Sequence, residues 1–271
     1  MLPIPVRVAL VGPDGADIPF VHDGVMATQH VLLLRDDSHE FVFEGIDSIP
    51  VPSLLRDFSA PVRLEHPLSE DDRLFLLRHD GNGVNRWLIA QELLTAELIR
   101  LATSGGECDS RLVDAITAML PGLADQDAAL AAKLLQFPSV HQLMDQMQRP
   151  DPDRLHEARL KLRGAVTRIL EPWFAALCQH GGADAYVFSA DAIARRALAN
   201  TALGFLVDFS PAYAAVAVER FTKAGNMTDE AAALTALVHA GCPEAEACLD
   251  VFGARWQQEA LVFVIVALID L

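Results

Sequence analysis

The sequence is poor in the residues on which several protein classes depend. Its four cysteines include no C-x-x-C pair, and they lie in segments with helical patterning. They are Cys108, Cys178, Cys242 and Cys248. This usage predicts a reduced chain without a disulfide framework. Basic residues are also scarce, because 21 Lys and Arg stand against 37 Asp and Glu, a formal net charge of -16. Such a surface repels a phosphate backbone, so we expect no nucleic-acid partner.

Long apolar runs are missing as well. Residues 260–269 are unbroken apolar, but a bilayer-spanning helix needs about 20 such residues. The first residues lack the pattern of a secretory signal, because Arg7 interrupts them and a Gly-Pro-Asp-Gly turn follows at 12–15. We therefore expect a cytoplasmic chain with no membrane partner.

Residues 1–67 have the pattern of a small β domain, in which short β-rich runs alternate with turn residues. The runs predicted as strands are residues 6–11, 31–34, 40–43, 54–58 and 62–65. Strands with one apolar face cannot bury that face alone, so a partner layer is required. We expect a partial Ig-like β-sandwich over 1–67.

From residue 68 to 271 the sequence predicts helices, beginning with Ser69 as a cap followed by acidic residues. The helices are predicted at 85–103, 111–120, 125–136, 139–148, 151–179 with a kink or break at Pro172, 189–209, 212–224, 228–240 and 244–271. Short loops make neighbouring helices antiparallel. The predicted fold class is mostly α, with antiparallel helix pairs in an α-solenoid-like, HEAT- or armadillo-like array over 68–271.

A search for catalytic motifs finds none that is complete. A zincin needs H-E-x-x-H, in which two histidines one helical turn apart bind the metal. His39-Glu40 and His156-Glu157 begin this pattern, but no second histidine follows either pair. The nucleophile elbow G-x-S-x-G and the phosphate-binding glycine patterns are absent too. The sequence thus predicts no catalytic, metal-binding or cofactor-binding residue, and leaves substrate-binding residues unknown.

Two polar clusters permit a functional and a structural interpretation. They are Arg195 with Arg196, and Asn85-Arg86-Trp87 with Gln91. An exposed arginine pair can hold a peptide carboxylate, and an arginine beside an aromatic ring can stack at a domain junction. The structural alternative is pairing with the many acidic residues. The three tryptophans, Trp87, Trp173 and Trp256, are predicted to be buried between layers.

Five short segments carry a further signal through their order and spacing. They are residues 51–62 (VPSLLRDFSAPV), 85–87 (NRW) with 90–91 (AQ), 137–140 (FPSV), 195–198 (RRAL) with Asn200, and 226–229 (NMTD). Together they resemble the C-terminal half of bacterial aminopeptidase N, a family of gluzincin metallopeptidases. The resemblance covers about residues 3–262.

The resemblance implies that this chain holds only part of the family's architecture. That architecture is an N-terminal β domain, a catalytic domain with zinc on H-E-x-x-H and a downstream Glu, a small β-sandwich, and a helical cap. Only the last two are matched. The G-x-M-E-N motif that grips substrate is broken, because residues 24–26 (GVM) are followed by Ala27 and Thr28. The implication is zinc in the parent enzyme and no cofactor in this chain.

The chain departs from the family pattern at both ends. It begins after the family's first sandwich strands, which predicts an unpaired sheet edge and an uncovered apolar face. After residues 256–262 it ends in the apolar tail 263–271, where the family continues into further helices. The tail predicts aggregation or a partner.

Two hypotheses for function follow. In the first, the chain is the non-catalytic C-terminal segment of a zinc-dependent aminopeptidase that removes N-terminal amino acids from peptides. It walls and gates the active-site chamber, is inactive alone, and has the catalytic half as partner, in cis or as a separate chain. In the second, it is a free-standing α-solenoid interaction module with a concave binding surface. An enzyme with an unrecognised site is the third possibility, because sequence alone does not locate spatial clusters.

Overall fold

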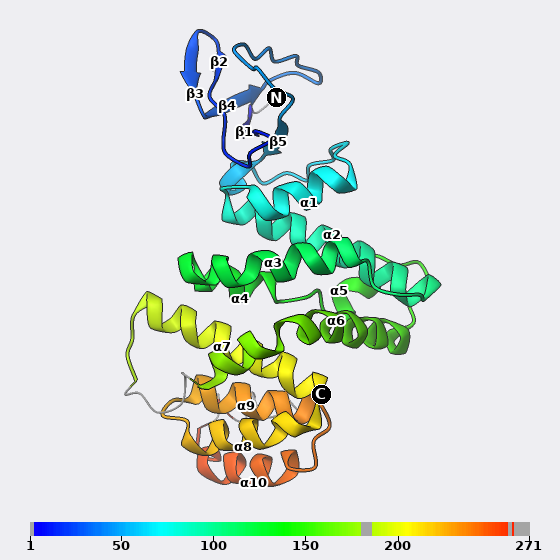
Figure 1. Cartoon of the computed structure of the whole chain (residues 1–271), viewed down its shortest axis with the longest axis vertical. Coiled ribbons are helices and arrows are strands. Elements are labelled where there is room, and N and C mark those ends of the chain that lie inside the picture. The colour runs from blue at the N-terminus through cyan, green and yellow to red at the C-terminus, as the bar shows by residue number, and fades with distance from the viewer. Residues whose placement is uncertain (1–2, 180–185, 260–261, 263–271) are drawn as a thin grey trace. The chain divides into compact units, whose positions relative to one another are not determined.

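A computed structural model describes residues 3–179, 186–259 and 262 of the chain, and Figure 1 shows its elements. The strands are β1 Ile4–Val11, β2 Phe20–His22, β3 Val25–Ala27, β4 Gln29–Leu34 and β5 Val51–Leu54. The helices are α1 Glu70–His79, α2 Gly83–Ser104, α3 Ser110–Gln126, α4 Ala128–Leu134, α5 Val140–Met144, α6 Pro152–Gln179, α7 Ala190–Phe209, α8 Ala214–Lys223, α9 Met227–His239 and α10 Ala245–Trp256. The predicted fold class, mostly helical with a small β part, is confirmed.

The chain forms two compact units, which we describe separately. Unit 1 comprises Met1–Glu97 and Asp109–Met119, and unit 2 comprises Leu98–Cys108 and Leu120–Leu271. Unit 1 therefore contains the strands together with α1 and the first parts of α2 and α3. The described helices include none that is both long and apolar enough to cross a membrane.

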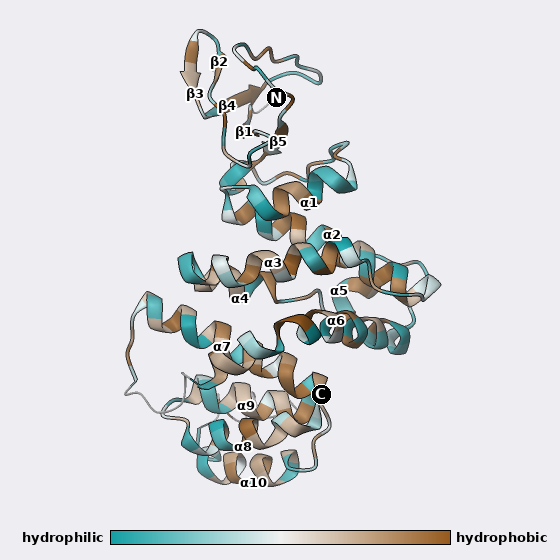
Figure 2. Cartoon of the chain, viewed as in Figure 1, coloured by the Kyte–Doolittle hydropathy of each residue, from teal (hydrophilic) through white to brown (hydrophobic). Residues whose placement is uncertain are grey.

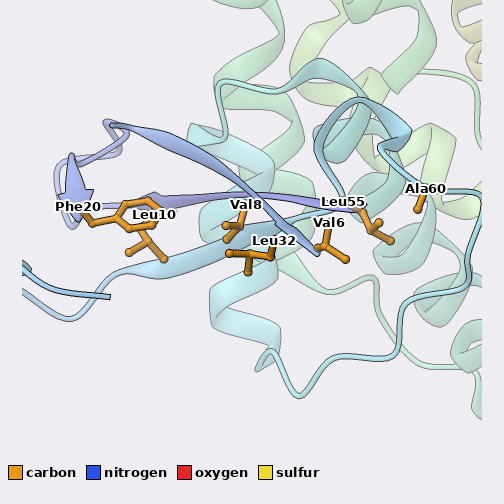
Figure 3. Close-up of a cluster of buried hydrophobic side chains, with 7 residues drawn as sticks. All are labelled: Val6, Val8, Leu10, Phe20, Leu32, Leu55 and Ala60. Carbon is orange, nitrogen blue, oxygen red and sulfur yellow. The ribbon is translucent and has the colours of Figure 1, made fainter. Parts of the chain in front are cut away.

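The main sheet of unit 1 is antiparallel, with the strand order β4-β1-β5. Val6 pairs with Leu32 on β4, and Ala9 pairs with Ser53 on β5. The apolar side chains of one face of β1 join a cluster drawn in Figure 3, which consists of Val6, Val8, Leu10, Phe20, Leu32, Leu55 and Ala60. Ala9 and Val11, on the opposite face of β1, are also fully buried. Strand β1 is thus the centre of the β part.

The strand predictions were partly right. The runs at 6–11 and 31–34 are strands β1 and β4, but the described residues at 40–43 and 62–65 form no strand. The predicted strand at 54–58 is wrong, because β5 ends at Leu54 and a short 3-10 turn follows at Arg56–Phe58. Leu55 and Asp57 both have φ of 57°, which ends an extended strand.

The β2-β3 hairpin was missed. Its two-residue turn is Asp23-Gly24, with φ of 50° and 74°. An Asp-Gly pair between apolar runs favours such a turn, because glycine accepts positive φ without steric cost and aspartate tolerates it. The signal was present in the sequence.

Helix positions follow the predictions more closely. Ser69 caps α1 through a reciprocal capping box with Asp72, and Ser139 caps α5 in the same way with Gln142. Helix α6 continues through Pro172, so the predicted interruption is not a break. The predicted last helix is observed as α10, and most of its remainder lies outside the described residues.

Helix α7 is the centre of unit 2 and packs against α4, α6 and α9. Phe205 on α7 contacts Phe137 and Phe174, with ring centroids 5.5 Å and 5.4 Å away. Leu203 and Leu206 on the same helix are fully buried. In Figure 2 the first half of α6 is mainly hydrophilic, whereas its second half is more hydrophobic. Polar side chains of α6 thus concentrate in its first half.

Unit 1 also contains a buried ionic network centred on Arg56. This side chain is 1% exposed. Its Nη1 and Nη2 donate to Asp17 at 2.5 Å and 2.8 Å, and Nη2 also donates to Asp80 at 2.8 Å. Burial by itself lowers the pKa of Arg56, but the hydrogen bonds and charges of the two carboxylates outweigh it and raise that pKa. The guanidinium is therefore held charged inside the fold.

Neighbouring polar groups extend this network. Ser53 on β5 accepts from Arg56 Nε at 2.8 Å and donates to Asp80 at 2.6 Å. Asn85 on α2 donates through Nδ2 to Ser53 Oγ and to the Leu54 carbonyl, each at 2.9 Å. The network thus joins β5, the end of α1 and the start of α2 within unit 1.

We predict that Arg56→Met destabilises unit 1 by about 3–5 kcal/mol, because it leaves the carboxylate of Asp80, itself fully buried, without its cation. The matched control is Arg7→Met, which breaks the exposed ion pair with Asp57 and should cost under about 1 kcal/mol. Urea unfolding with hydrogen exchange mapped onto unit 1 measures both. Equal effects of the two substitutions would contradict the role of Arg56.

Candidate functional site

Neither of the two incomplete zinc motifs belongs to a described cluster that could bind a metal ion. Among the residues that the structure describes, no group of three or more His, Cys, Asp or Glu side chains is placed to hold a metal ion. His39 stacks on Phe41 with ring centroids 4.3 Å apart. His156 is exposed in the first half of α6. The described part of the chain therefore offers no donor set that fits zinc.

The arginine pair of α7 is engaged locally. Arg195 donates to Asp191, one turn earlier, at 2.7 Å. Arg196 donates to the Val187 carbonyl at 3.0 Å, and its guanidinium lies 4.8 Å from the ring centroid of Tyr186. Arg195 thus has the acidic partner that the structural interpretation expects, whereas Arg196 contacts a backbone carbonyl and an aromatic ring.

The second sequence cluster, at the start of α2, is also structural. Asn85 belongs to the network of Arg56, and Arg86 donates to the Leu77 carbonyl at 3.1 Å. Burial lowers the pKa of Arg86, and the charge of Asp80 only partly opposes this. Gln91 lies half-buried further along the helix.

The prediction that the three tryptophans are buried was wrong. Trp87, Trp173 and Trp256 are each half-buried. The indole N–H of Trp256 donates to the buried Glu230 at 3.2 Å, so this ring lies beside a polar group. The fully buried aromatic rings are phenylalanines, which carry no polar atom that needs a partner.

Two of the five sequence segments meet in a polar network of unit 2. Asn200 on α7 donates to Asp229 on α9 at 2.8 Å and accepts from Arg220 on α8 at 3.1 Å. Arg220 also donates to the Cys178 carbonyl at the end of α6 at 2.8 Å. Asn226, the cap of α9, donates to Asp229 at 2.8 Å. The network joins four helices of this unit.

The four cysteines are free thiols. Burial raises the pKa of Cys178 to about 11, although the nearby charge of Arg220 lowers it in part. A thiol of that pKa is protonated and unreactive at neutral pH. Cys178 is therefore a packing residue.

A groove of about 670 Å³ lies in unit 2 and is lined by charged residues. Its walls come from the segment before α5 and from α6, α7 and α9. Its charged or titratable lining residues are His156, Arg159, Arg163, Asp208 and His239. Asp208 is the single carboxylate among the residues that line it. With neutral histidines the groove has one net positive charge, within a chain of net charge -16.

The two arginines of the groove differ in their partners. Arg163 pairs with Asp208 at 2.7 Å and lies over the ring of Phe205, 3.8 Å from its centroid. Arg159 donates to the Phe137 carbonyl at 3.2 Å. Burial lowers the pKa of Arg159 to about 10, assisted by the positive charge of Arg163 and opposed by Asp208. The charge of Arg163 is thus neutralised by direct contact with Asp208, whereas Arg159 interacts with the charge of Asp208 only at longer range.

Sequence analysis missed this groove. One local signal was available, since residues four apart on a helix share a face, as Arg159 and Arg163 do on α6. The partner Asp208 lies 45 residues later. No local pattern predicts that pairing.

Matches to known protein families cover almost the whole chain. Residues 1–67 match the family described as a domain of unknown function (DUF3458) with an Ig-like fold, and residues 70–264 match the domain of unknown function DUF3458_C with ARM repeats. Aminopeptidase N of Escherichia coli (strain K12) is 34% identical over 267 residues, 96% of this chain and 30% of that protein. Aminopeptidase N of Caulobacter vibrioides is 33% identical over 248 residues, covering 89% of this chain and 28% of that protein.

A solved structure agrees with these matches. The crystal structure of Legionella pneumophila aminopeptidase A in complex with aspartic acid has a TM-score of 0.77 at 26% identity. The similarity covers 95% of this chain and 30% of that one. The chain therefore spans about 30% of the length of these relatives.

We predict that Asn200→Leu destabilises unit 2 by about 2–3 kcal/mol, because it removes partners from both Arg220 and Asp229 in a buried network. Thr201→Ala is the matched control, since the Thr201 hydroxyl donates only within its own helix, to the Ala197 carbonyl. Urea unfolding followed by circular dichroism compares the two. A loss for Asn200→Leu no larger than the control's would refute the bridging role.

Proposed function

Because the chain belongs to the DUF3458_C family of ARM-repeat domains and is homologous to the C-terminal region of aminopeptidase N, we propose that it is the non-catalytic C-terminal segment of such an aminopeptidase. The observation that carries the proposal is the extent of the match. The Ig-like and ARM-repeat families cover residues 1–67 and 70–264 in order, and the relatives align over nearly the full chain.

In this proposal the chemistry belongs to the remainder of the parent enzyme. The relatives extend well beyond the aligned region, since it makes up 30% of the Escherichia coli protein. A zinc-dependent catalytic portion, present in cis or as a separate chain, is the proposed partner. In the same proposal, the segment walls the active-site chamber and gates the access of peptides.

The alternative, a free-standing interaction module, is supported by the same architecture. A helical array commonly offers a concave surface, and unit 2 has a groove of about 670 Å³. Isolation of one dominant partner unrelated to peptidases, under conditions in which the catalytic portion does not bind, would favour this alternative.

We predict that the purified chain hydrolyses no aminoacyl p-nitroanilide, with or without added zinc, because no described cluster of side chains is placed to hold a metal ion that would activate water. Full-length Escherichia coli aminopeptidase N, before and after chelation, is the control for the assay. Zinc-dependent turnover that copurifies with the chain would show that the segment is not inactive.

A second measurement tests the partnership. The catalytic portion, expressed separately, should gain activity or thermal stability when the chain is added in equimolar amount. The Arg56→Met variant, whose unit 1 is predicted to be destabilised, should give a smaller gain at raised temperature. No gain and no association in gel filtration would contradict the proposed partnership.

A further inference from the structure

The described lining of the groove in unit 2 carries two arginines and one carboxylate, so its charges do not balance. Asp208 forms an ion pair with Arg163. Its Oδ2 lies 2.8 Å from Nε and 2.7 Å from Nη2 of that arginine. The side chains of Arg163 and Asp208 are only 16% and 15% exposed, so this pair is largely shielded from water. One positive charge, that of Arg159, is left over.

Arg159 is placed to act on a ligand. A guanidinium has five N–H donors, and the hydrogen bond that the structure gives this one is to the Phe137 carbonyl at 3.2 Å. Among the described residues, no carboxylate lies within 4.0 Å of its nitrogens. Arg163 lies one helical turn later on the same face of α6, so its charge adds to the positive potential around Arg159.

Three other polar groups of the groove already have hydrogen-bond partners. Asn200 is bonded to both Arg220 and Asp229. The hydroxyls of Thr201 and Thr235 donate to carbonyls of their own helices, each one turn earlier. Among the described lining residues, Arg159 is therefore the arginine without a carboxylate partner, beside the exposed His156 and His239.

The remaining lining favours an apolar body on the ligand. Leu160, which is 41% exposed, lies along the groove together with the half-buried Val140 and Ala232. A volume of about 670 Å³ falls in the range of small-molecule pockets, about 300–1,000 Å³. A carboxylate matches a guanidinium in shape as well as charge, because both are planar and can form two parallel hydrogen bonds.

We propose that this groove binds a carboxylate attached to an apolar body, with Arg159 as the carboxylate-binding residue. The shared chemistry has two sources, a small free acid or the C-terminus of a short apolar peptide. The proposal does not require the chain to belong to an active peptidase.

The test is calorimetric titration of the full chain with matched acid and amide probes. Hexanoate against hexanamide represents the small acid, and acetyl-Ala-Leu-Phe with a free or an amidated C-terminus represents the peptide. In at least one pair we expect the acid to bind about tenfold more tightly than the amide, and more weakly as salt is added. The pair that shows the difference identifies the source of the carboxylate.

Variants on α6 assign the effect to Arg159. Arg159→Gln should reduce acid binding about tenfold and abolish the difference between acid and amide, whereas Arg159→Lys keeps the charge and should keep part of the difference. Arg168→Gln is the matched control, since Arg168 is exposed and lies nine residues after Arg159. That spacing is about two and a half helical turns, which places Arg168 on the opposite face of α6.

The inference is overturned if neither acid binds at millimolar concentration, if acid and amide bind equally, or if Arg159→Gln binds the acid as well as the unmodified chain does. Thermal unfolding of each variant provides the folding control. Because Arg159 has no salt bridge in the described structure, we expect Arg159→Gln to unfold within a few degrees of the unmodified chain.

Discussion

The burial of Arg56 is the constraint on which unit 1 depends. A guanidinium removed from water is tolerated only when carboxylates and hydroxyls surround it, and here Asp17, Asp80 and Ser53 do so. These partners come from a loop after β1, the end of α1 and strand β5. The residue boundary between the two matched families, at 67–70, therefore falls inside a single electrostatic network, and cutting there would leave buried charges on both sides.

The helical part of the fold could be predicted well, because its determinants are local. Apolar residues recur with helical spacing, and Ser69, Ser139, Ser189 and Asn226 mark helix starts through hydrogen bonds to backbone amides within three residues. The strands depended on distant partners. Residues 40–43 alternate polar and apolar side chains as a strand does, yet no described strand pairs with them, and the nearby bridge joins Glu44 to Val21.

The polar sites could be predicted only where their contacts are close in sequence. Arg195 meets Asp191 one turn away, so the preference for structural pairing could be argued from spacing. The bridge from Asn200 to Asp229 spans 29 residues, and that from Arg163 to Asp208 spans 45. Order and spacing of the five segments were enough to identify the family. They did not show that four of these segments are hydrogen-bonded in two pairs, through Asn85 to Ser53 and through Asn200 to Asp229.

The burial of both faces of strand β1 affects how well the register of the sheet is specified. Val8, Ala9, Leu10 and Val11 are all buried, so sliding this strand by one residue would exchange one apolar side chain for another. Hydrophobicity alone therefore discriminates poorly between the correct alignment and a shifted one. Ser53, opposite Ala9, must point toward Arg56 for the ion network to close. The polar cluster thus favours the correct register over a shifted one, which hydrophobicity alone does not do.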